Sequence, residues 1–341
     1  MIRRLPAEWE PQVGVLLAWP HADSDWRDNL ESVQQVFAAI TAAISRFESV
    51  LIVAPNTNMV RQQLDAAGID QTRVRLVQLP TNDTWARDFG PITVLENGIP
   101  LILDFGFNAW GLKFAADLDN QITARLAGLG AFGTTPLKIP GLILEGGSLE
   151  SNGAGTLLTT SECLLSPNRN PHLDQYGIEQ ILTEQLGVHH FLWLNHGFLA
   201  GDDTDSHIDT LARLCPGDTI VYVRCDDTED EHFQALTAME VELRTLRTPQ
   251  GAPYRLIPLP WPKPCFAEDG HRLPATYANF LIINGAVLVP TYNDCKDAAA
   301  LKILADVFVG REIIGIDCRP LIAQHGSLHC VTMQLPQGVL P

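Results

Sequence analysis

The first third of the chain alternates between short apolar runs and longer amphipathic stretches. The runs at 13–19, 50–54 and 74–79 have the length and composition of buried strands. Between them, 31–47 and 59–67 place apolar residues three or four positions apart, which is the spacing of one helix face. Strands that alternate with helices in this way are typical of the α/β class.

Further along, the dipeptide Asn-Gly recurs between β-type runs, at 97–98, 152–153 and 284–285. Asn-Gly between such runs is a strong signal for a β-hairpin. The spacings are 55 and 132 residues, and Cys-Pro-Gly-Asp at 215–218 supplies a turn in the longer interval. Helical spacing follows each of these turns, at 117–129, 177–186, 229–246 and 297–309.

These features suggest a hairpin, helix and strand unit that repeats every 60 to 68 residues, roughly. Five such units would account for all 341 residues. Self-similarity at a fixed period indicates a propeller or ring, in which each unit buries its face against its neighbours. We therefore predict a single α/β domain over residues 1–341 with a central channel.

The composition narrows the range of partners. A formal net charge of −17 argues against nucleic acid and anionic membranes, because both require a cationic surface. The same charge would attract a small cation. No apolar run approaches the roughly 18 residues of a membrane span. We expect neither a nucleic-acid nor a membrane partner.

The cysteines and the first residues bear on the compartment. Seven cysteines are scattered without a Cys-x-x-Cys pair, which argues against a disulfide scaffold or a zinc ribbon. Residues 1–10 lack the apolar core of a signal peptide. We therefore expect reduced thiols and a cytoplasmic location.

The stretch 201–214 packs four carboxylates and one histidine into eight residues before it becomes apolar. The spacing of its apolar residues predicts a short helix over 208–214, with Asp205 or Ser206 as N-cap. Acidic residues at a helix N-terminus need no further function. Alternatively, the His207-Ile-Asp209 segment presents a proton shuttle beside a carboxylate.

Three further positions carry candidate chemistry. Asp88 follows Trp85 in a loop closed by Gly-Pro, Glu145 ends an apolar run before two glycines, and Cys330 precedes a β-type run. Taken alone, each of these residues is equally compatible with ordinary packing. Asp88, Glu145 and His207 are 57 and 62 residues apart, and Cys330 follows after 123, about two periods. A ring of units would bring them to one end of the channel, as a nucleophilic site without metal.

A transition-metal site built on His207, Asp209 and a distant acid such as Asp88 is the alternative from another class, since these side chains bind such ions. The chain has no His-x-His and no His-Glu-x-x-His motif to support it.

Six short motifs occur in order along most of the chain: Trp-Ala-Arg-Asp-Phe-Gly-Pro (85–91), Phe-Asn-Ala-Trp-Gly (107–111), Glu-Gly-Gly (145–147), Asn-Arg-Asn-Pro (168–171), His-Ile-Asp (207–209) and Leu-His-Cys-Val-Thr (328–332). Together they resemble the agmatine deiminases and bacterial peptidylarginine deiminases, which are guanidino-group-modifying enzymes. The resemblance implies the fold of that family, a five-bladed α/β propeller (pentein), in agreement with the five units counted above.

The resemblance also implies roles for the candidate residues. Cys330 would be the nucleophile and His207 the general acid and base. Asp88 and Asp209 would grip the guanidinium, which suits bidentate, charge-assisted hydrogen bonds to two carboxylates. Glu145 would orient the histidine. These five residues form the expected catalytic set.

The expected substrate is a small cationic guanidine, agmatine in the first place, converted to N-carbamoylputrescine and ammonia through a covalent thiouronium, as in putrescine biosynthesis. Trp85 and Trp110 are candidate walls for its aliphatic tail. Asp202, Asp203 or Asp205 would meet the far amine, unless they only cap a helix. The resemblance implies no cofactor and no metal, and it implies a homodimer.

The chain departs from the agmatine-specific pattern at three places. Thr210 replaces the Asn that typically follows His-x-Asp, Ser206 replaces a Gly, and 325–327 is His-Gly-Ser where the family is commonly glycine-rich. A deiminase of peptidylarginine or of another arginine derivative therefore stays open. So do a metal-dependent hydrolase and a non-catalytic protein that binds guanidines or polyamines.

Overall fold

The computed structural model describes residues 2–341. Its strands form five sheets of three or four strands each and one separate two-stranded ribbon. The sheets comprise β1 (Arg3–Arg4), β5 (Ile92–Glu96), β6 (Ile99–Leu103) and β7 (Leu137–Lys138); β8 (Glu150–Ser151), β9 (Thr156–Thr160) and β10 (His190–Leu194); β11 (Ala212–Cys215), β12 (Thr219–Val223) and β13 (Arg255–Leu259); β16 (Leu281–Ile283), β17 (Ala286–Thr291) and β18 (Glu312–Asp317); and β19 (Met333–Pro336), β2 (Gln12–Ala18), β3 (Ser49–Ala54) and β4 (Val74–Gln78). The ribbon pairs β14 (Cys265–Phe266) with β15 (Arg272–Leu273).

The five sheets share one order of pairing. Apart from the short edge strand β1, which pairs antiparallel with β5, each sheet has one antiparallel pair and continues with a parallel strand reached through a helical crossover. Four of the antiparallel pairs are hairpins that turn at 97–98, 152–153, 215–218 and 284–285, as the sequence predicts. The number of sheets also equals the five units expected from the repeat.

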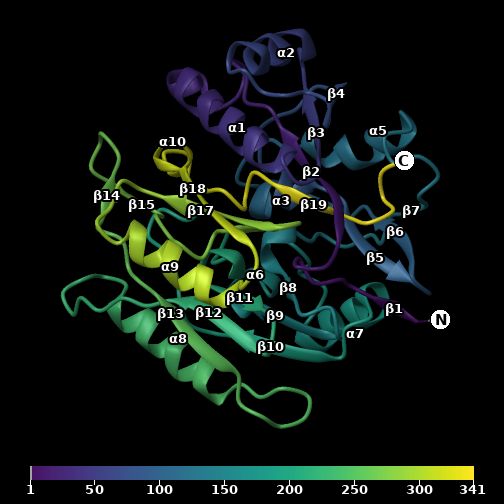
Figure 1. The fold of residues 1–341 in the computed structure, drawn as a ribbon. Coiled ribbons are helices and arrows are strands. Elements are labelled where there is room, and N and C mark those ends of the chain that lie inside the picture. The colour runs from purple at the N-terminus through teal and green to yellow at the C-terminus, as the bar shows by residue number, and fades with distance from the viewer. Residues whose placement is uncertain (1) are drawn as a thin grey trace.

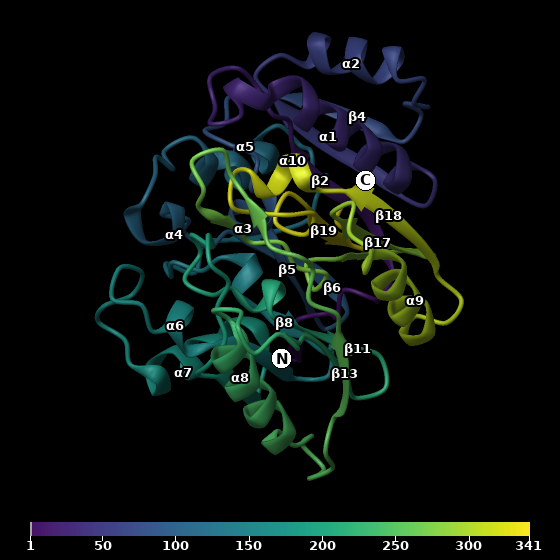
Figure 2. The same cartoon turned by 90° about the vertical axis from the view of Figure 1, so that its left-hand side faces the viewer.

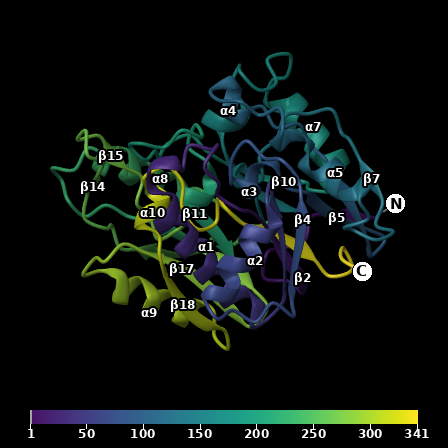
Figure 3. The ribbon, with the colours of Figure 1, turned by 90° about the horizontal axis from the view of Figure 1, so that it is seen from above.

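The fifth antiparallel pair joins the two ends of the chain. β19, close to the C-terminus, pairs antiparallel with β2, close to the N-terminus, and Figure 1 labels the two next to each other. Figure 3 shows both ends of the chain on the same side of the molecule. The last sheet therefore closes the series on itself. It also brings the segment that carries Cys330 next to the sheet that contains the first long strand.

The longer helices lie around the outside of the strands, as Figures 1 and 2 show. They include α1 (Leu30–Ser45), α2 (Thr57–Ala66), α5 (Ile122–Gly128), α7 (Gln175–Leu186), α8 (Phe233–Thr245) and α9 (Asp297–Val307). Helix α1 shows why: its residues Val33, Phe37, Ile40 and Ile44 are fully buried against the core at helical spacing. Shorter helical turns are α3 (Ala86–Phe89), α4 (Ala109–Leu112), α6 (Ser161–Leu164), α10 (Arg319–Ile322), η1 (Arg27–Asn29), η2 (Asp119–Gln121), η3 (Gly146–Ser148) and η4 (Ile208–Thr210).

The predicted helix over 208–214 is wrong. A single turn, η4, is followed directly by β11, whose four residues are all buried. A strand buried on both faces shows no alternation of apolar and polar residues, so its pattern was mistaken for a helix face. Neither Asp205 nor Ser206 caps a helix, because their φ angles are 64° and 59°.

The structure confirms the α/β class. Along residues 2–341, no helix has both the length and the apolar character needed to cross a bilayer.

Candidate active site

The candidate residues occupy equivalent places in successive sheets. Each lies in the few residues that precede the first strand of an antiparallel pair, and these strands are neighbours around the series. The positions are Asp88 before β5, Glu145 before β8, His207 and Asp209 before β11, Asn279 before β16 and Cys330 before β19. All six side chains are buried. The repeat thus brings together residues that are up to 242 positions apart in the chain.

His207 lies between two carboxylates. Its Nδ1 atom is 3.6 Å from Oδ1 of Asp88, and its Nε2 atom is 3.8 Å from Oε2 of Glu145. Burial disfavours the charged imidazolium, but Asp88 and Glu145 outweigh it, together with Cys163, and the pKa of His207 is raised well above its ordinary value. The two flanking carboxylates therefore favour the protonated form of His207, which is the form that can donate a proton.

Gly147 allows this close approach. A Cβ atom at this position would lie 2.5 Å from Nδ1 of His207, 2.9 Å from Oδ1 of Asp88 and 3.2 Å from Oδ2 of Asp209. The three side chains therefore converge on one point, and any residue larger than glycine would occupy it. The N–H group of Gly147 also donates to Oδ1 of Asp88 at 2.9 Å.

Asp88 is held from two sides. Gly147 binds one carboxylate oxygen, and the indole N–H of Trp110 donates to the other at 3.0 Å. Burial, together with the nearby carboxylates of Asp209 and Glu145, raises the pKa of Asp88 to about 6 even though His207 opposes the shift. An incoming cation would lower the pKa of Asp88 again, because an opposite charge favours the ionised carboxylate.

Asp209 is fixed by His329, the residue next to the candidate nucleophile. Nδ1 of His329 lies 2.7 Å from Oδ2 of Asp209, and its Nε2 lies 2.7 Å from Oε2 of Glu8. Burial opposes ionisation of Asp209, but His329 outweighs it and the pKa of Asp209 is lowered. Oδ1 of Asp209 is buried and has no hydrogen-bond partner within residues 2–341. One oxygen of a permanent carboxylate is thus free for a ligand.

The positive charge of Arg213 balances two buried acids behind His329, Glu8 and Glu150. Arg213 is fully buried and pairs with Glu150 and, at 3.0 Å, with Glu8. The chain of contacts Arg213, Glu8, His329 and Asp209 extends from the core to the site, so the acids of the centre are mutually oriented by hydrogen bonds.

Cys330 is one of the residues that line a cavity. Its Sγ atom is 3.4 Å from Oδ1 of Asn279, which also accepts from the backbone N–H of Cys330 at 3.3 Å. Burial raises the pKa of the Cys330 thiol well above its ordinary value, and the carboxylates of Asp209 and Asp88 add to the shift. Without a ligand, the sulfur is therefore a thiol and not a thiolate.

The cavity measures about 580 Å³ and is strongly acidic. Cys330 and Asp88 form part of its lining, and Trp85 and Trp110 stand in its wall with ring centroids 6.2 Å apart. No lysine or arginine lines it in the described structure. The further carboxylates on its lining are Asp23, Asp25, Asp83, Asp119 and Asp203. A cavity of this kind suits a cation with an apolar middle.

The predicted residues divide into two groups. Asp88, Cys330, Trp85 and Trp110 line the cavity. His207, Asp209 and Glu145 are not on its lining and lie directly behind Asp88, within the contacts given above.

The three acids proposed for the far amine also separate. Asp203 lines the cavity, whereas Asp205 pairs with Arg169 and Lys113. Asp202 accepts hydrogen bonds from the backbone N–H groups of Thr204 and Ser206. Asp203 is thus the member of this group that a ligand in the cavity could reach.

Several contributing residues escaped the sequence analysis. Asn279 could have been found, since it lies one repeat after His207 and one before Cys330. Arg169, in the Asn-Arg-Asn-Pro motif, binds both carboxylate oxygens of Glu145, at 3.0 and 2.8 Å. Glu8 lies in Leu-Pro-Ala-Glu-Trp-Glu-Pro (5–11), where the family resemblance begins, but nothing in that motif indicates its contact with His329.

Groups of three possible metal donors occur twice in residues 2–341: Glu145 with Cys163 and His207, and Glu8 with Glu150 and His329. Neither is the set of Asp88, His207 and Asp209 that a metal-dependent hydrolase was expected to use. The first group lies on the far side of His207 from Asp88 and is treated below.

A thiol on the lining of an acidic cavity, with a histidine among three carboxylates behind it, suits a small organic cation next to a candidate nucleophile. In agreement, residues 4–336 match the model of the Porphyromonas-type peptidyl-arginine deiminases, and the chain belongs to this family.

Relatives of known name support the assignment. The chain is 34% identical to the agmatine deiminase of Stutzerimonas stutzeri, over 97% of this chain and 95% of the relative. A C. jejuni agmatine deiminase, solved with substrate bound as a variant with serine in place of a cysteine, has a TM-score of 0.91 at 42% identity, covering 99% of this chain and 97% of that one. A Porphyromonas gingivalis protein, provisionally named an arginine deiminase, has a TM-score of 0.95 at 53% identity, with coverage of 99% and 100%.

Proposed function

We propose that this protein is an agmatine deiminase, a hydrolase that converts agmatine and water into N-carbamoylputrescine and ammonia. The observation that carries the proposal is the cavity whose lining includes Cys330 and Asp88, together with further carboxylates and no basic residue among those described other than histidine. Agmatine is positive at both ends with an apolar chain between them. The names of the relatives, one of them a C. jejuni agmatine deiminase with its substrate bound, point the same way.

In this proposal the guanidinium binds between Asp88 and the free oxygen of Asp209. Paired N–H donors match the two carboxylates in charge-assisted hydrogen bonds. The bound cation offsets the negative charge that holds the Cys330 thiol protonated, so the thiol loses its proton to water only when substrate is present. Activation of the nucleophile is thereby coupled to binding.

The thiolate then attacks the central carbon of the guanidinium, and a C–S bond forms. His207 transfers its proton to one nitrogen of the tetrahedral adduct, the C–N bond breaks, and ammonia leaves. The product of this half-reaction is a thiouronium on Cys330, next to a neutral His207. Glu145 keeps the imidazole oriented throughout.

In the second half-reaction, neutral His207 removes a proton from water as the oxygen attacks the same carbon. The C–S bond breaks and Cys330 leaves as a thiolate. The hydroxyl of the adduct gives its remaining proton to solvent as the C=O bond forms, and the ureido product departs. Rebinding of one proton from solvent restores the resting thiol. Asn279, which contacts the sulfur, would fix its position during both steps.

Agmatine is favoured over free arginine by the same lining. The α-carboxylate of arginine would enter a cavity with several carboxylates and no lysine or arginine among the described residues to pair with it. Trp85 and Trp110 would flank the aliphatic tail, and Asp203 would meet the far ammonium. Peptidylarginine, which carries no carboxylate at this point, is the competitor that needs a direct test.

One panel tests the proposal: ammonia release from agmatine, arginine and a peptidylarginine at equal concentrations, with Cys330→Ala as the blank. We expect release from agmatine to exceed the others and to vanish in the variant. Equal release by Cys330→Ala would refute the nucleophile, whereas preference for the peptide would reassign the substrate. Retained binding of agmatine without any product would make the protein a guanidine-binding protein.

We also propose that the enzyme works in the cytoplasm as a single domain. All seven cysteines are free thiols in the structure, as a reducing compartment would maintain them. The family resemblance adds a homodimer, which light scattering of the purified protein would test.

A further inference from the structure

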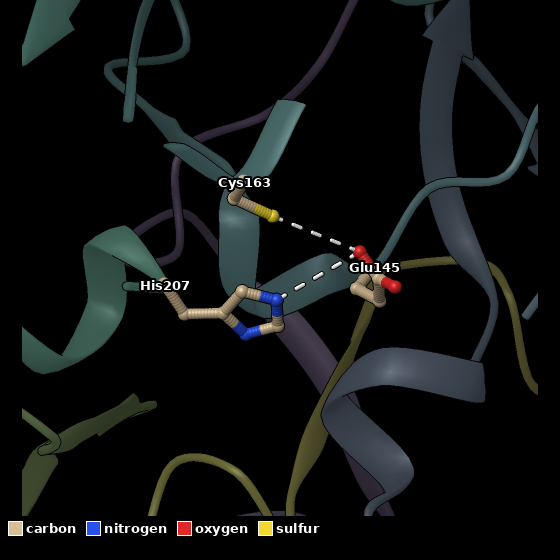
Figure 4. A group of neighbouring side chains, drawn as sticks. All are labelled: Glu145, Cys163 and His207. Atoms are coloured by element: carbon tan, nitrogen blue, oxygen red, sulfur yellow. Dashed lines mark hydrogen bonds and ion pairs between the residues drawn. The ribbon is translucent and has the colours of Figure 1, made fainter. Parts of the chain in front are cut away.

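Behind His207, three donor atoms of different kinds face one another (Figure 4). Sγ of Cys163, on α6, lies 3.8 Å from Oε2 of Glu145, and Nε2 of His207 lies 3.8 Å from the same oxygen. All three atoms are within 4.8 Å of one another. The side chains are at most 1% exposed. The deimination steps make no use of Cys163.

One of these donors makes no hydrogen bond. Nε2 of His207 is buried without a hydrogen-bond partner in the described part of the chain, and Oε2 of Glu145 lies 3.8 Å from it. An arginine contacts the carboxylates of both three-donor groups, Arg169 in this one and Arg213 in the other, but in the other group both ring nitrogens of His329 also have partners within 3.1 Å. The nitrogen without a hydrogen bond therefore sets the first group apart as a candidate ligand site.

We propose that Glu145, Cys163 and His207 form a binding site for a thiophilic divalent cation, Zn²⁺ in the first place, and that occupancy inhibits the enzyme. A point equidistant from three donors at these separations lies about 2.1 to 2.5 Å from each of them, close to zinc distances of about 2.3 Å to sulfur and about 2.0 to 2.2 Å to nitrogen and oxygen. Thiolate and imidazole favour Zn²⁺ over Ca²⁺ and Mg²⁺, which prefer oxygen. A water molecule would complete the tetrahedron.

Replacing two protons by one Zn²⁺ ion leaves the net charge of Glu145, Cys163 and His207 unchanged. Without metal, a carboxylate, an imidazolium and a thiol sum to zero. With Zn²⁺, a carboxylate, a neutral imidazole and a thiolate again sum to zero, because one ion replaces two protons. The positive charge of the adjacent Arg169 would repel the ion. Two acids balance that charge, because Arg169 pairs with Asp205 at 2.6 Å as well as with Glu145.

The expected inhibition follows from coordination of the ion by Nε2 of His207. With Nε2 coordinated, His207 can no longer cycle between imidazolium and imidazole, so it neither protonates ammonia nor activates water. Because the donors are buried, the ion enters only when His207 or its neighbours move, and inhibition develops with time. This consequence rests on the proposed function, but binding of the ion does not.

Binding is tested with Co²⁺ as a spectroscopic substitute for Zn²⁺, in the full-length Cys330→Ala protein, where the cavity thiol is absent. We expect one ion per chain and a thiolate-to-cobalt charge-transfer band, displaced by Zn²⁺. Adding Cys163→Ala or Cys163→Ser should remove the band and weaken binding by at least the roughly 10- to 100-fold that loss of an outer-shell partner costs. Cys318→Ala, which removes another fully buried thiol, is the matched control and should keep both.

A Cys330→Ala protein that shows no charge-transfer band overturns the site without reference to any Cys163 variant.

Activity supplies the second test, on the protein with Cys330 intact. We expect Zn²⁺ to inhibit it progressively, with chelator restoring turnover, and Cys163→Ser to lose that progressive inhibition relative to its own metal-free rate. Inhibition unchanged in Cys163→Ser, together with binding lost in Cys330→Ala, would place the ion on the nucleophile instead. If agmatine is not the substrate, the cobalt experiment still decides the site.

Discussion

The Nδ1 atom of His329 lies 2.7 Å from Oδ2 of Asp209, and Oδ1 of that carboxylate is buried without a hydrogen-bond partner among the described residues. The same imidazole contacts Glu8 at 2.7 Å through its other nitrogen. The residue before the candidate nucleophile therefore positions the carboxylate that is proposed to grip the substrate, although it does not line the cavity itself.

Replacing His329 by Asn should weaken substrate binding more than turnover. A hydrogen bond to a charged group contributes about 1.5 to 3 kcal/mol, so kcat/KM should fall about 10- to 100-fold, mainly through KM. Steady-state kinetics with agmatine measures the split. His172→Asn, at an exposed histidine, is the matched control and should behave as the parent protein. A fall in kcat alone would instead assign His329 a part in the chemical step.

The dependence of activity on pH follows from two opposite requirements. Asp88 must be a carboxylate to hold the guanidinium, and its pKa is raised to about 6, so kcat/KM should fall as the pH drops through about 6. His207 must carry a proton, and its pKa is raised, so activity should fall only at a pH well above the ordinary value of about 6.5 for histidine. Rates of ammonia release from about pH 5 to 10 at subsaturating agmatine give both limbs. A profile without an acid limb would rule out ionisation of Asp88 as the first requirement.

Gly147→Ala should inactivate the protein without unfolding it. The added methyl group would lie 2.5 Å from Nδ1 of His207, so the imidazole must shift. A displacement of about 1 Å at a reacting group costs about 100-fold in rate, and we expect at least that loss in kcat.

Gly128→Ala is the matched control for Gly147→Ala. Gly128 lies in α5 with nothing within 4 Å of the added atom, so activity should persist and stability should rise by about 0.5 to 1 kcal/mol. Wild-type rates in Gly147→Ala would show that His207 tolerates displacement and would argue against its proposed role.

Much of the fold could be predicted from local sequence signals. Four hairpins were visible because Asn-Gly or Pro-Gly-Asp occupies tight turns between strands. The fifth pair was not, because β19 and β2 come from opposite ends of the chain and share no turn. The stretch 208–214 was wrongly predicted as helix because β11 is buried on both faces and carries the fully buried Arg213, which breaks any apolar pattern.

The residues of the candidate site that occupy equivalent positions in the repeat could be predicted from the sequence. Asp88, Glu145, His207 and Cys330 are spaced by about one or two repeats, and Asn279 would have followed from counting the omitted one. Glu8 could not be predicted, because its bond to His329 spans 321 residues and depends on the closure of the last sheet. The contact between Cys163 and Glu145 likewise depends on how two turns pack.

The network under the site should also govern stability. Arg213 is fully buried and pairs with Glu8 and Glu150, so Arg213→Met would remove the cation that these two buried carboxylates share and leave Glu8 with His329 as its partner. Removing one partner of a buried pair costs about 3 to 5 kcal/mol. In a chain of this length the midpoint of thermal unfolding should fall by roughly 4 to 7 °C. Arg46→Met breaks an ion pair with Glu312 in which both side chains are about half exposed, and it should shift the midpoint far less.

Calorimetry or urea titration of both variants measures the difference in stability between them, which should narrow at acid pH as the carboxylates protonate. Equal midpoints for the two variants would mean that the buried acids find other partners, and the account of the central network would then have to be abandoned.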